Sequence, residues 1–291
     1  MKLIGLIILL IVMAISAGCK DGCEPFHPEP SPTPVPPFGT VVRTLPSTYQ
    51  GVGSIDLDGD SFWEYSRGYA ELRKRSLSNG DLQEIITLDG RLTGLWAVCK
   101  DPQRLCWWAS NPDWKNFESE NGNFIKLGLN GEILQVNRVS DNWSKPPLII
   151  RDLDYNADYE FEDQDGNKIT IGLISTSDWH YSIRKSDFLD VENGYWEQYW
   201  NRLDLQVAGI THAGGFCWAA CDGDNPESGQ YPIVEFKQPP RKQWAERTGR
   251  KIIIPGVWFS SLKAQGRSIW GRGINKGTGE TLIYQISLGP E

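Results

Sequence analysis

A tryptophan-centred pattern recurs along the chain and restricts the folds open to it more than any other feature. Each copy has a small or Gly residue, an apolar segment and a polar turn, and then an apolar residue, a Trp and another small residue. Trp63, Trp107, Trp218 and Trp270 mark four copies, and Tyr159 takes the Trp position between the second and the third. A pattern that repeats about every 50 residues is typical of arrays in which each copy is one packing unit.

The turn signals along the chain are those of β-hairpins, and no long helical period accompanies them. Five turn dipeptides lie beside apolar or alternating segments: Asn79-Gly80, Asp89-Gly90, Asn130-Gly131, Asp165-Gly166 and Asn193-Gly194. Such dipeptides favour tight hairpin turns. We expect hairpins over residues 72–88 and 124–136, and short helices at 187–200 and 243–248 at most. The predicted class is all-β.

The repeat resembles the blades of β-propellers, in which an apolar strand near the axis precedes a strand with a buried Trp. The resemblance implies one β-propeller domain over residues 39–291, with about five blades, or six if residues 170–205 form a blade of their own. In such a fold the four Trp residues are core residues, and Trp96 and Trp258 lie on inner strands. A β-sandwich without true repeats is the alternative.

The N-terminus has the pattern of an export signal. Lys2 precedes an apolar run from Leu3 to Ile15, and Ser16-Ala17-Gly18-Cys19 follows it. The run is shorter than the about 20 residues of a membrane span and fits a signal peptide. It resembles a bacterial lipoprotein signal, which implies that residues 1–18 are removed and that Cys19 is lipidated. We then expect a lipoprotein anchored in the outer membrane or at the cell surface. An ordinary cleaved signal is the alternative.

A proline-rich linker precedes the domain, and the chain carries a negative net charge. Residues 19–38 hold alternating prolines, which favour an extended polyproline II spacer of roughly 40 Å. The formal net charge is -8, which disfavours a general nucleic-acid binder because phosphate binding needs positive surface. The expected partners are the membrane, through the lipid anchor, and a protein or glycan at the cell envelope.

Four cysteines of the domain are disulfide candidates, because exported proteins fold in an oxidising compartment. Cys99 and Cys106 flank a short turn, so a disulfide across a hairpin is expected there. Cys217 and Cys221 would lie about 13 Å apart in an extended strand, too far for a disulfide. Either the chain bends after Ala219 or each has another partner. The spacings do not match a zinc site.

Two acidic segments align without gaps, Asp56 to Tyr65 and Asp152 to Phe161. Oxygen-bearing side chains occur at relative positions 1, 3, 5 and 9: Asp56, Asp58, Asp60 and Glu64 in the first, and Asp152, Asp154, Asn156 and Glu160 in the second. Alternate oxygens in a tight loop suit Ca²⁺, and the spacing resembles the FG-GAP calcium loops of integrin-α-type propeller repeats. The resemblance implies structural calcium, although Ser61 and Ala157 replace the usual Gly at position 6. Two solvated acidic turns are the alternative.

No catalytic motif is present, and the sequence favours binding over catalysis. It lacks G-x-S-x-G, P-loop, G-x-G-x-x-G and H-E-x-x-H patterns, and His180 and His212 fit structural roles. Five Trp residues outside the repeat are candidates for stacking on a ligand: Trp114, Trp143, Trp179, Trp196 and Trp200. We predict a non-catalytic binding or assembly protein stabilised by calcium. The alternatives are a glycosidase-like carbohydrate-active enzyme and a purely structural envelope lipoprotein.

Overall fold

The structure of the chain is a computed structural model. It describes residues 34–102, 105–111, 124–137, 150–162, 168–176, 182–186, 199–202, 206–221, 230–237 and 245–290; for 156–202 it describes the backbone alone. Residues Met1–Val35 form one compact unit and Pro36–Glu291 another. Within the described ranges there is no helix with the length and apolar character that crossing a membrane requires.

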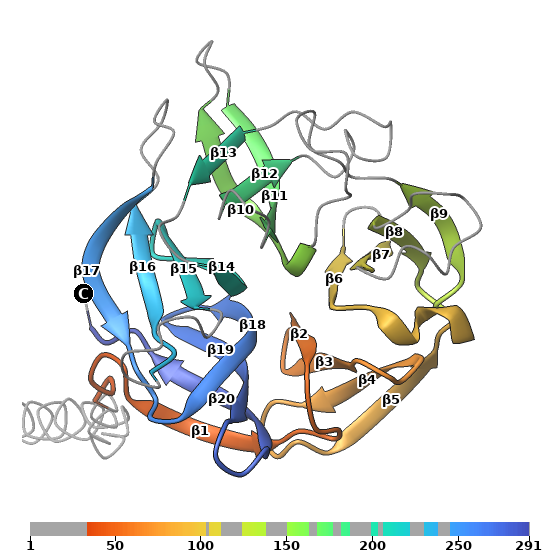
Figure 1. Ribbon diagram of the computed structural model, residues 1–291, viewed down its shortest axis with the longest axis horizontal. Coiled ribbons are helices and arrows are strands. Elements are labelled where there is room, and N and C mark those ends of the chain that lie inside the picture. Colours follow the sequence, from red (N-terminus) through yellow and green to blue (C-terminus); the bar gives the residue numbers. More distant parts are fainter. Residues whose placement is uncertain are drawn as a thin grey trace, which may run out of the picture. The chain divides into compact units, whose positions relative to one another are not determined.

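Strands dominate the second unit, and in the described ranges they form five antiparallel sheets of four strands each (Figure 1). The first sheet contains β2 (Gly53–Asp58), β3 (Ser61–Ser66), β4 (Glu71–Ser76) and β5 (Leu82–Thr87). The second contains β6 (Ala97–Asp101), β7 (Cys106–Ser110), β8 (Phe124–Gly128) and β9 (Ile133–Asn137). The third contains β10 (Ile150–Glu162), β11 (Lys168–Thr176), β12 (Ser182–Ser186) and β13 (Tyr199–Arg202). The fourth contains β14 (Val207–Ala213), β15 (Phe216–Cys221), β16 (Ile233–Lys237) and β17 (Glu246–Ile252).

The fifth sheet joins the two ends of the domain. Its order is β1 (Val41–Pro46), β20 (Thr281–Ser287), β19 (Ser268–Asn275) and β18 (Val257–Gln265). Strand β1 pairs antiparallel with β20, and Thr44 lies opposite Tyr284. An N-terminal strand therefore completes the C-terminal sheet and closes the ring. The expected all-β class and propeller arrangement are confirmed.

The turn signals place the hairpins correctly, and the expected helices are wrong where the structure describes them. Asn79-Gly80 connects β4 to β5, and Asn130-Gly131 connects β8 to β9. A short 3-10 helix, η1 (Gly90–Gly94), follows Asp89, whose side chain accepts a hydrogen bond from the backbone N–H of Arg91. The ends of both expected helices lie in strands, β13 and β17, because cross-strand pairing outweighs local helix preference.

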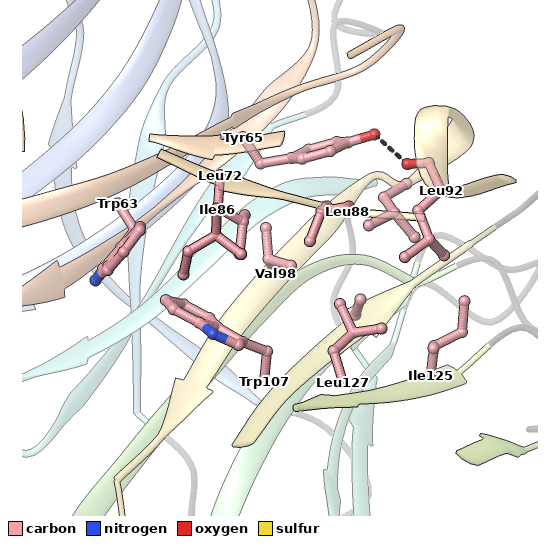
Figure 2. Packing of buried hydrophobic residues seen from close by; sticks show 12 residues of the cluster. Trp63, Tyr65, Leu72, Ile86, Leu88, Leu92, Val98, Trp107, Ile125 and Leu127 are labelled. Atoms are coloured by element: carbon pink, nitrogen blue, oxygen red, sulfur yellow. Dashed lines mark hydrogen bonds between the residues drawn. The ribbon is translucent and has the colours of Figure 1, made fainter. Parts of the chain in front are cut away.

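The four repeat tryptophans are core residues, as predicted. Their exposed fractions are 4% for Trp63, 1% for Trp107, 1% for Trp218 and 3% for Trp270. Figure 2 shows the packing between the first two sheets, where the Trp63 and Trp107 rings meet edge to face with centroids 5.1 Å apart. The Tyr65 hydroxyl donates a 2.8 Å hydrogen bond to the carbonyl of Leu92 at the edge of this cluster.

Replacing a repeat tryptophan tests this packing. We expect Trp107→Ala to lower the free energy of unfolding by about 3–5 kcal/mol, because a buried aromatic side chain leaves a large cavity. Leu134→Ala is the control, since Leu134 is 52% exposed on the outer strand β9, and it should change stability by less than about 0.5 kcal/mol. Urea denaturation measures both; equal losses would contradict the core assignment.

Candidate functional site

Side chains at the propeller axis connect the sheets, whose backbone ladders do not extend from one sheet to the next. The Ser54 hydroxyl accepts a 3.0 Å hydrogen bond from the Val98 N–H of the second sheet. Asp152 has the same role in the third sheet, because its Oδ2 accepts from the Ile210 N–H of the fourth sheet at 2.9 Å. The first strand of each of these sheets is therefore the strand nearest the axis.

Asp152 also reaches the fifth sheet. Its Oδ2 accepts a 3.0 Å bond from the Leu262 N–H, and its Oδ1 accepts a 2.9 Å bond from the Ser261 hydroxyl. Strands β14 and β18 approach closely beside it, since a Cβ on Gly209 would lie 3.1 Å from the Ser261 backbone. One buried carboxylate thus joins three sheets.

Asp56 and Asp154 occupy equivalent positions one step along the axis. The Asp56 Oδ2 accepts a 2.7 Å bond from the Lys100 N–H, and the Asp154 Oδ2 accepts a 3.2 Å bond from the His212 N–H. The structure therefore matches Asp56 to Asp154, whereas the gapless sequence alignment matches Asp56 to Asp152. The sequence alignment is therefore offset by two residues. The two Asp-Leu-Asp segments are identical in sequence, but they occupy different positions relative to the hydrogen bonds between the sheets.

Lys263 of β18 is the buried cation of this cluster. Its Nζ lies 3.7 Å from Asp152 Oδ1 and 3.7 Å from Asp154 Oδ1, and it donates a hydrogen bond to the Leu153 carbonyl. Burial favours a neutral lysine, but the two carboxylates outweigh it and raise the pKa of Lys263. Burial also raises the pKa of Asp152 to about 6 and raises the pKa of Asp154. The cluster therefore holds more acid than the single lysine neutralises.

A cavity of about 670 Å³ opens at the end of the axis where the first turns of the sheets meet. Carboxyl groups of Asp56, Asp58 and Asp154 line it, together with Lys100, His212 and Tyr155. Its rim consists largely of small residues: Gly59, Ala213, Gly214, Gly215, Ala264 and Gly266. The volume is within the range of small-molecule sites, roughly 300–1,000 Å³, and the small rim residues leave the entrance open.

Two neighbouring carboxyl groups of the cavity have opposite pKa shifts. Burial raises the pKa of Asp56 to about 7. Burial by itself would raise the pKa of Asp58, but hydrogen bonds from Lys74, Lys100 and Trp63 outweigh burial and lower this pKa to about 2. The Asp58 Oδ2 lies 2.9 Å from the Lys74 Nζ and 3.1 Å from the Lys100 Nζ. One acid is therefore fully ionised at neutral pH, and the other is near its titration midpoint.

The structure does not bring the four predicted ligands of the first calcium loop together. Asp56 lies opposite Trp63 in the ladder while Glu64 lies opposite Ile55, so the two acids are on opposite faces of the sheet. Glu64 is buried against Arg75, 3.2 Å away, and Arg272, 3.6 Å away. Asp60 lies exposed in the turn. Lysine side chains thus pair with Asp58 and arginine side chains with Glu64, two of the four acids that were expected to hold calcium.

The described acids of the second predicted calcium loop have different partners from those of the first. Asp152 and Asp154 bind backbone N–H groups and Lys263 at the axis, while the side chains of Asn156 and Glu160 lie outside the described residues. Over the parts of the chain that the structure describes, no group of three or more His, Cys, Asp or Glu side chains is arranged to hold a metal ion. Calcium at the second loop stays a prediction.

The expected disulfides are absent among the described cysteines. In the hairpin, Cys99 lies opposite Trp108 and Cys106 lies opposite Asp101, so the two cysteines are diagonal neighbours, too far apart for a bond at about 7–8 Å between Cα atoms. Cys217 and Cys221 both lie in the extended strand β15, and the expected bend after Ala219 does not occur. Cys19 lies outside the described residues.

The tryptophans proposed to contact a ligand receive no structural test. Trp114, Trp143, Trp179 and Trp196 lie outside the described residues, and Trp200 lies in β13, of which the backbone alone is described. His180 also lies outside them, and His212 is 4% exposed in β14, not in a turn. Sequence reasoning missed Lys263, although a lone Lys between the buried Leu262 and Ala264 in an apolar strand was a usable signal.

Comparisons with known proteins agree with the fold. No protein-family model and no curated protein matches the sequence. The glutaminyl cyclase of Myxococcus xanthus superposes with a TM-score of 0.54 and 11% identity, over 87% of this chain and 97% of that one. The PQQ-bound aldose sugar dehydrogenase of Streptomyces coelicolor gives 0.44 and 10%, over 85% and 97%. U3-55K gives 0.46 and 7%, over 86% and 100%. At 11% identity, the likeness to the cyclase shows the fold alone.

The raised pKa of Asp56 predicts a pH-dependent cost to stability. An unfolded Asp loses its proton at about pH 4, before the folded group does at about 7, so the free energy of unfolding falls as the pH rises between these values. We expect Asp56→Asn to remove the contribution of Asp56 to this fall in the free energy of unfolding. The variant should be more stable than the wild type at pH 8 by about 1–3 kcal/mol, and the two should differ little at pH 4.

Urea denaturation at pH 4, 6 and 8 measures the effect. Asp89→Asn is the matched control, because Asp89 is paired with Arg91 at the surface, 2.8 Å away, and its pKa is lowered to about 2 by Arg91. This control should show no gain at pH 8. A constant difference between Asp56→Asn and the wild type at all three pH values would contradict the raised pKa.

Proposed function

We propose that the protein is an exported, lipid-anchored, five-bladed propeller that binds a small polar ligand in its axial cavity. The cavity carries this proposal, since each of the five sheets contributes lining residues to it: Asp56, Lys100, Asp154, His212 and Ala264. Propellers commonly use the end of the axis in this way because loops of all the sheets meet there. The role fits a binding or assembly protein of the cell envelope.

The chemistry of the lining favours a ligand with several polar groups. The ionised Asp58 accepts hydrogen bonds, and the Lys100 ammonium and the Thr211 hydroxyl donate them. Donors and acceptors that alternate around one cavity suit a ligand that carries both, such as a monosaccharide or a short glycan. A glycan of the envelope would be within reach of a protein held there by a lipid.

One observation favours a second function, a carbohydrate-active enzyme. Asp56 and Asp58 line one cavity with pKa values of about 7 and about 2, and a protonated acid beside an ionised carboxylate is the combination that glycosidases use. Turnover of any glycoside in a broad chromogenic screen, lost in Asp56→Asn, would replace the binding role with this one. The absence of turnover alongside ligand binding would support the binding role.

The proposed anchor is testable at one residue. We expect the wild-type protein, expressed in a bacterial host, to sediment with membranes and to incorporate labelled palmitate at Cys19. Cys19→Ala should abolish the labelling and move the protein to the soluble envelope fraction, because one acyl-bearing cysteine supplies the anchor. Membrane association that persists unlabelled in Cys19→Ala would contradict lipidation at this residue.

The cavity is testable by filling it. In a thermal-shift screen of monosaccharides and other small polar compounds, we expect some compounds to raise the melting temperature of the wild type through linkage to binding. Pro102→Trp places a large ring at an exposed part of the cavity lining and should abolish the shifts. Leu134→Trp, on the exposed outer strand β9, should keep them. Shifts of equal size in all three proteins would place the ligand elsewhere.

A further inference from the structure

Four buried acids in the described part of the domain have a cationic partner: Glu64, Glu235, Asp152 and Asp154. Arg75 lies 3.2 Å from Glu64, and Arg250 lies 2.8 Å from Glu235. Lys263 lies 3.7 Å from both Asp152 and Asp154, as described above. A buried carboxylate is costly unless a cation and hydrogen bonds compensate its charge, and each of these acids satisfies that requirement within the protein.

The Asp56 carboxyl group has no such cationic partner among the described residues. Its side chain is 8% exposed and lines the cavity, and its Oδ2 accepts a hydrogen bond from the backbone N–H of Lys100. The lysine side chain turns instead to Asp58, 3.1 Å away. In the described part of the chain, no Lys or Arg side-chain nitrogen lies within 4 Å of the Asp56 carboxyl group. A nearly buried acid at a cavity wall thus lacks the close cation that Glu64, Glu235, Asp152 and Asp154 have.

The titratable groups around Asp56 come from every inner strand, and they do not supply that cation. On β2, the strand of Asp56, the Asp58 carboxylate pairs with Lys74 and Lys100. The groups on the other inner strands are Cys99 and Lys100 on β6, Asp154 on β10, His212 on β14 and Lys263 on β18. Lys263 acts on Asp56 only from beyond ion-pair distance and is shared by two other acids. None of these cations is thus available to Asp56 alone, and the space beside Asp56 is the cavity.

We propose that the cavity binds a small organic cation and that the Asp56 carboxylate pairs with a primary ammonium group of this ligand. The inference rests on the proposed function, a ligand site in the axial cavity, and names the charge of the ligand. An ammonium group supplies three donors and replaces the missing partner of Asp56. The ammonium can belong to an amino sugar or to an aliphatic amine, and the remaining lining, with Thr211 and Tyr155, faces the rest of the molecule.

Binding of such a ligand should depend on pH through Asp56. The carboxyl group must lose its proton to form the ion pair, and burial places its pKa at about 7, so binding releases protons near neutral pH. The fraction ionised rises about tenfold between pH 6 and pH 8, and the affinity should rise by about the same factor. Putrescine stays protonated from pH 6 to pH 8, whereas the ammonium group of an amino sugar loses protons in the upper part of this range.

Isothermal titration calorimetry on the full chain in detergent micelles tests the proposal. Four sugars of one ring size separate charge from shape: glucosamine, glucose, N-acetylglucosamine and glucuronate. Putrescine represents aliphatic amines, and calcium chloride represents a metal ion. We expect putrescine to bind about tenfold more tightly at pH 8 than at pH 6, and glucosamine to gain less, because its own ammonium group loses protons as the pH approaches 8. The neutral and acidic sugars should bind at least tenfold more weakly than the better amine.

Variants assign the effect to Asp56. Asp56→Asn keeps an oxygen for the Lys100 N–H and should lose both the amine binding and its pH dependence, whereas Asp89→Asn, a surface change of the same kind, should keep both. Equal binding of glucose or N-acetylglucosamine would overturn the charge assignment and leave the cavity as a ligand site. Binding of calcium without amines would overturn it in favour of a metal. If no probe binds, the ligand site itself is refuted with it.

Discussion

The structure depends on polar side chains that connect sheets at the axis, above all on Asp152. Sheets of a propeller have no shared backbone ladder, so contacts between neighbours must come from side chains. Asp152 accepts hydrogen bonds from the N–H groups of Ile210 and Leu262 and from the Ser261 hydroxyl, and Lys263 balances its charge. Removing the lysine would leave buried negative charge, which in comparable sites costs about 3–5 kcal/mol.

A second buried ion pair holds the ring at its closure. Arg272 of β19 in the last sheet is 0% exposed, and its Nε lies 3.6 Å from Glu64 of the first sheet. Its Nη2 also donates to the Tyr49 carbonyl at 2.9 Å and to the Ser66 hydroxyl at 2.8 Å. The pairing of β1 with β20 closes the same junction through the backbone. Opening of the ring therefore requires the loss of both kinds of contact at once.

The residues that fix the axis also line the cavity, so a substitution there changes the stability of the fold and the lining of the cavity together. Asp154 is a structural acceptor for the His212 N–H and at the same time part of the cavity wall. Asp56 shares both roles but has no side-chain cation within ion-pair distance among the described residues, and burial, with a smaller contribution from Asp154, raises its pKa. A buried titratable group at a cavity wall is a recognised mark of a functional site, because a fold seldom keeps such a cost without a use.

The sequence by itself determined the all-β class, the repeat and the buried tryptophans, since these follow from local turn residues and from the apolar pattern around Trp63 and Trp107. It also singled out Asp56 and Asp152, two acids that accept hydrogen bonds from neighbouring sheets. Only the tertiary structure decided what those acids do. Their partners, Lys100, Ile210 and Lys263, lie on other sheets, and no local spacing reveals a contact between strands far apart in sequence. The same distance in sequence hid Arg272 on β19, the cation beside Glu64. The expected Cys99–Cys106 disulfide failed for a local reason, because the hairpin register places Cys99 opposite Trp108 and Cys106 opposite Asp101.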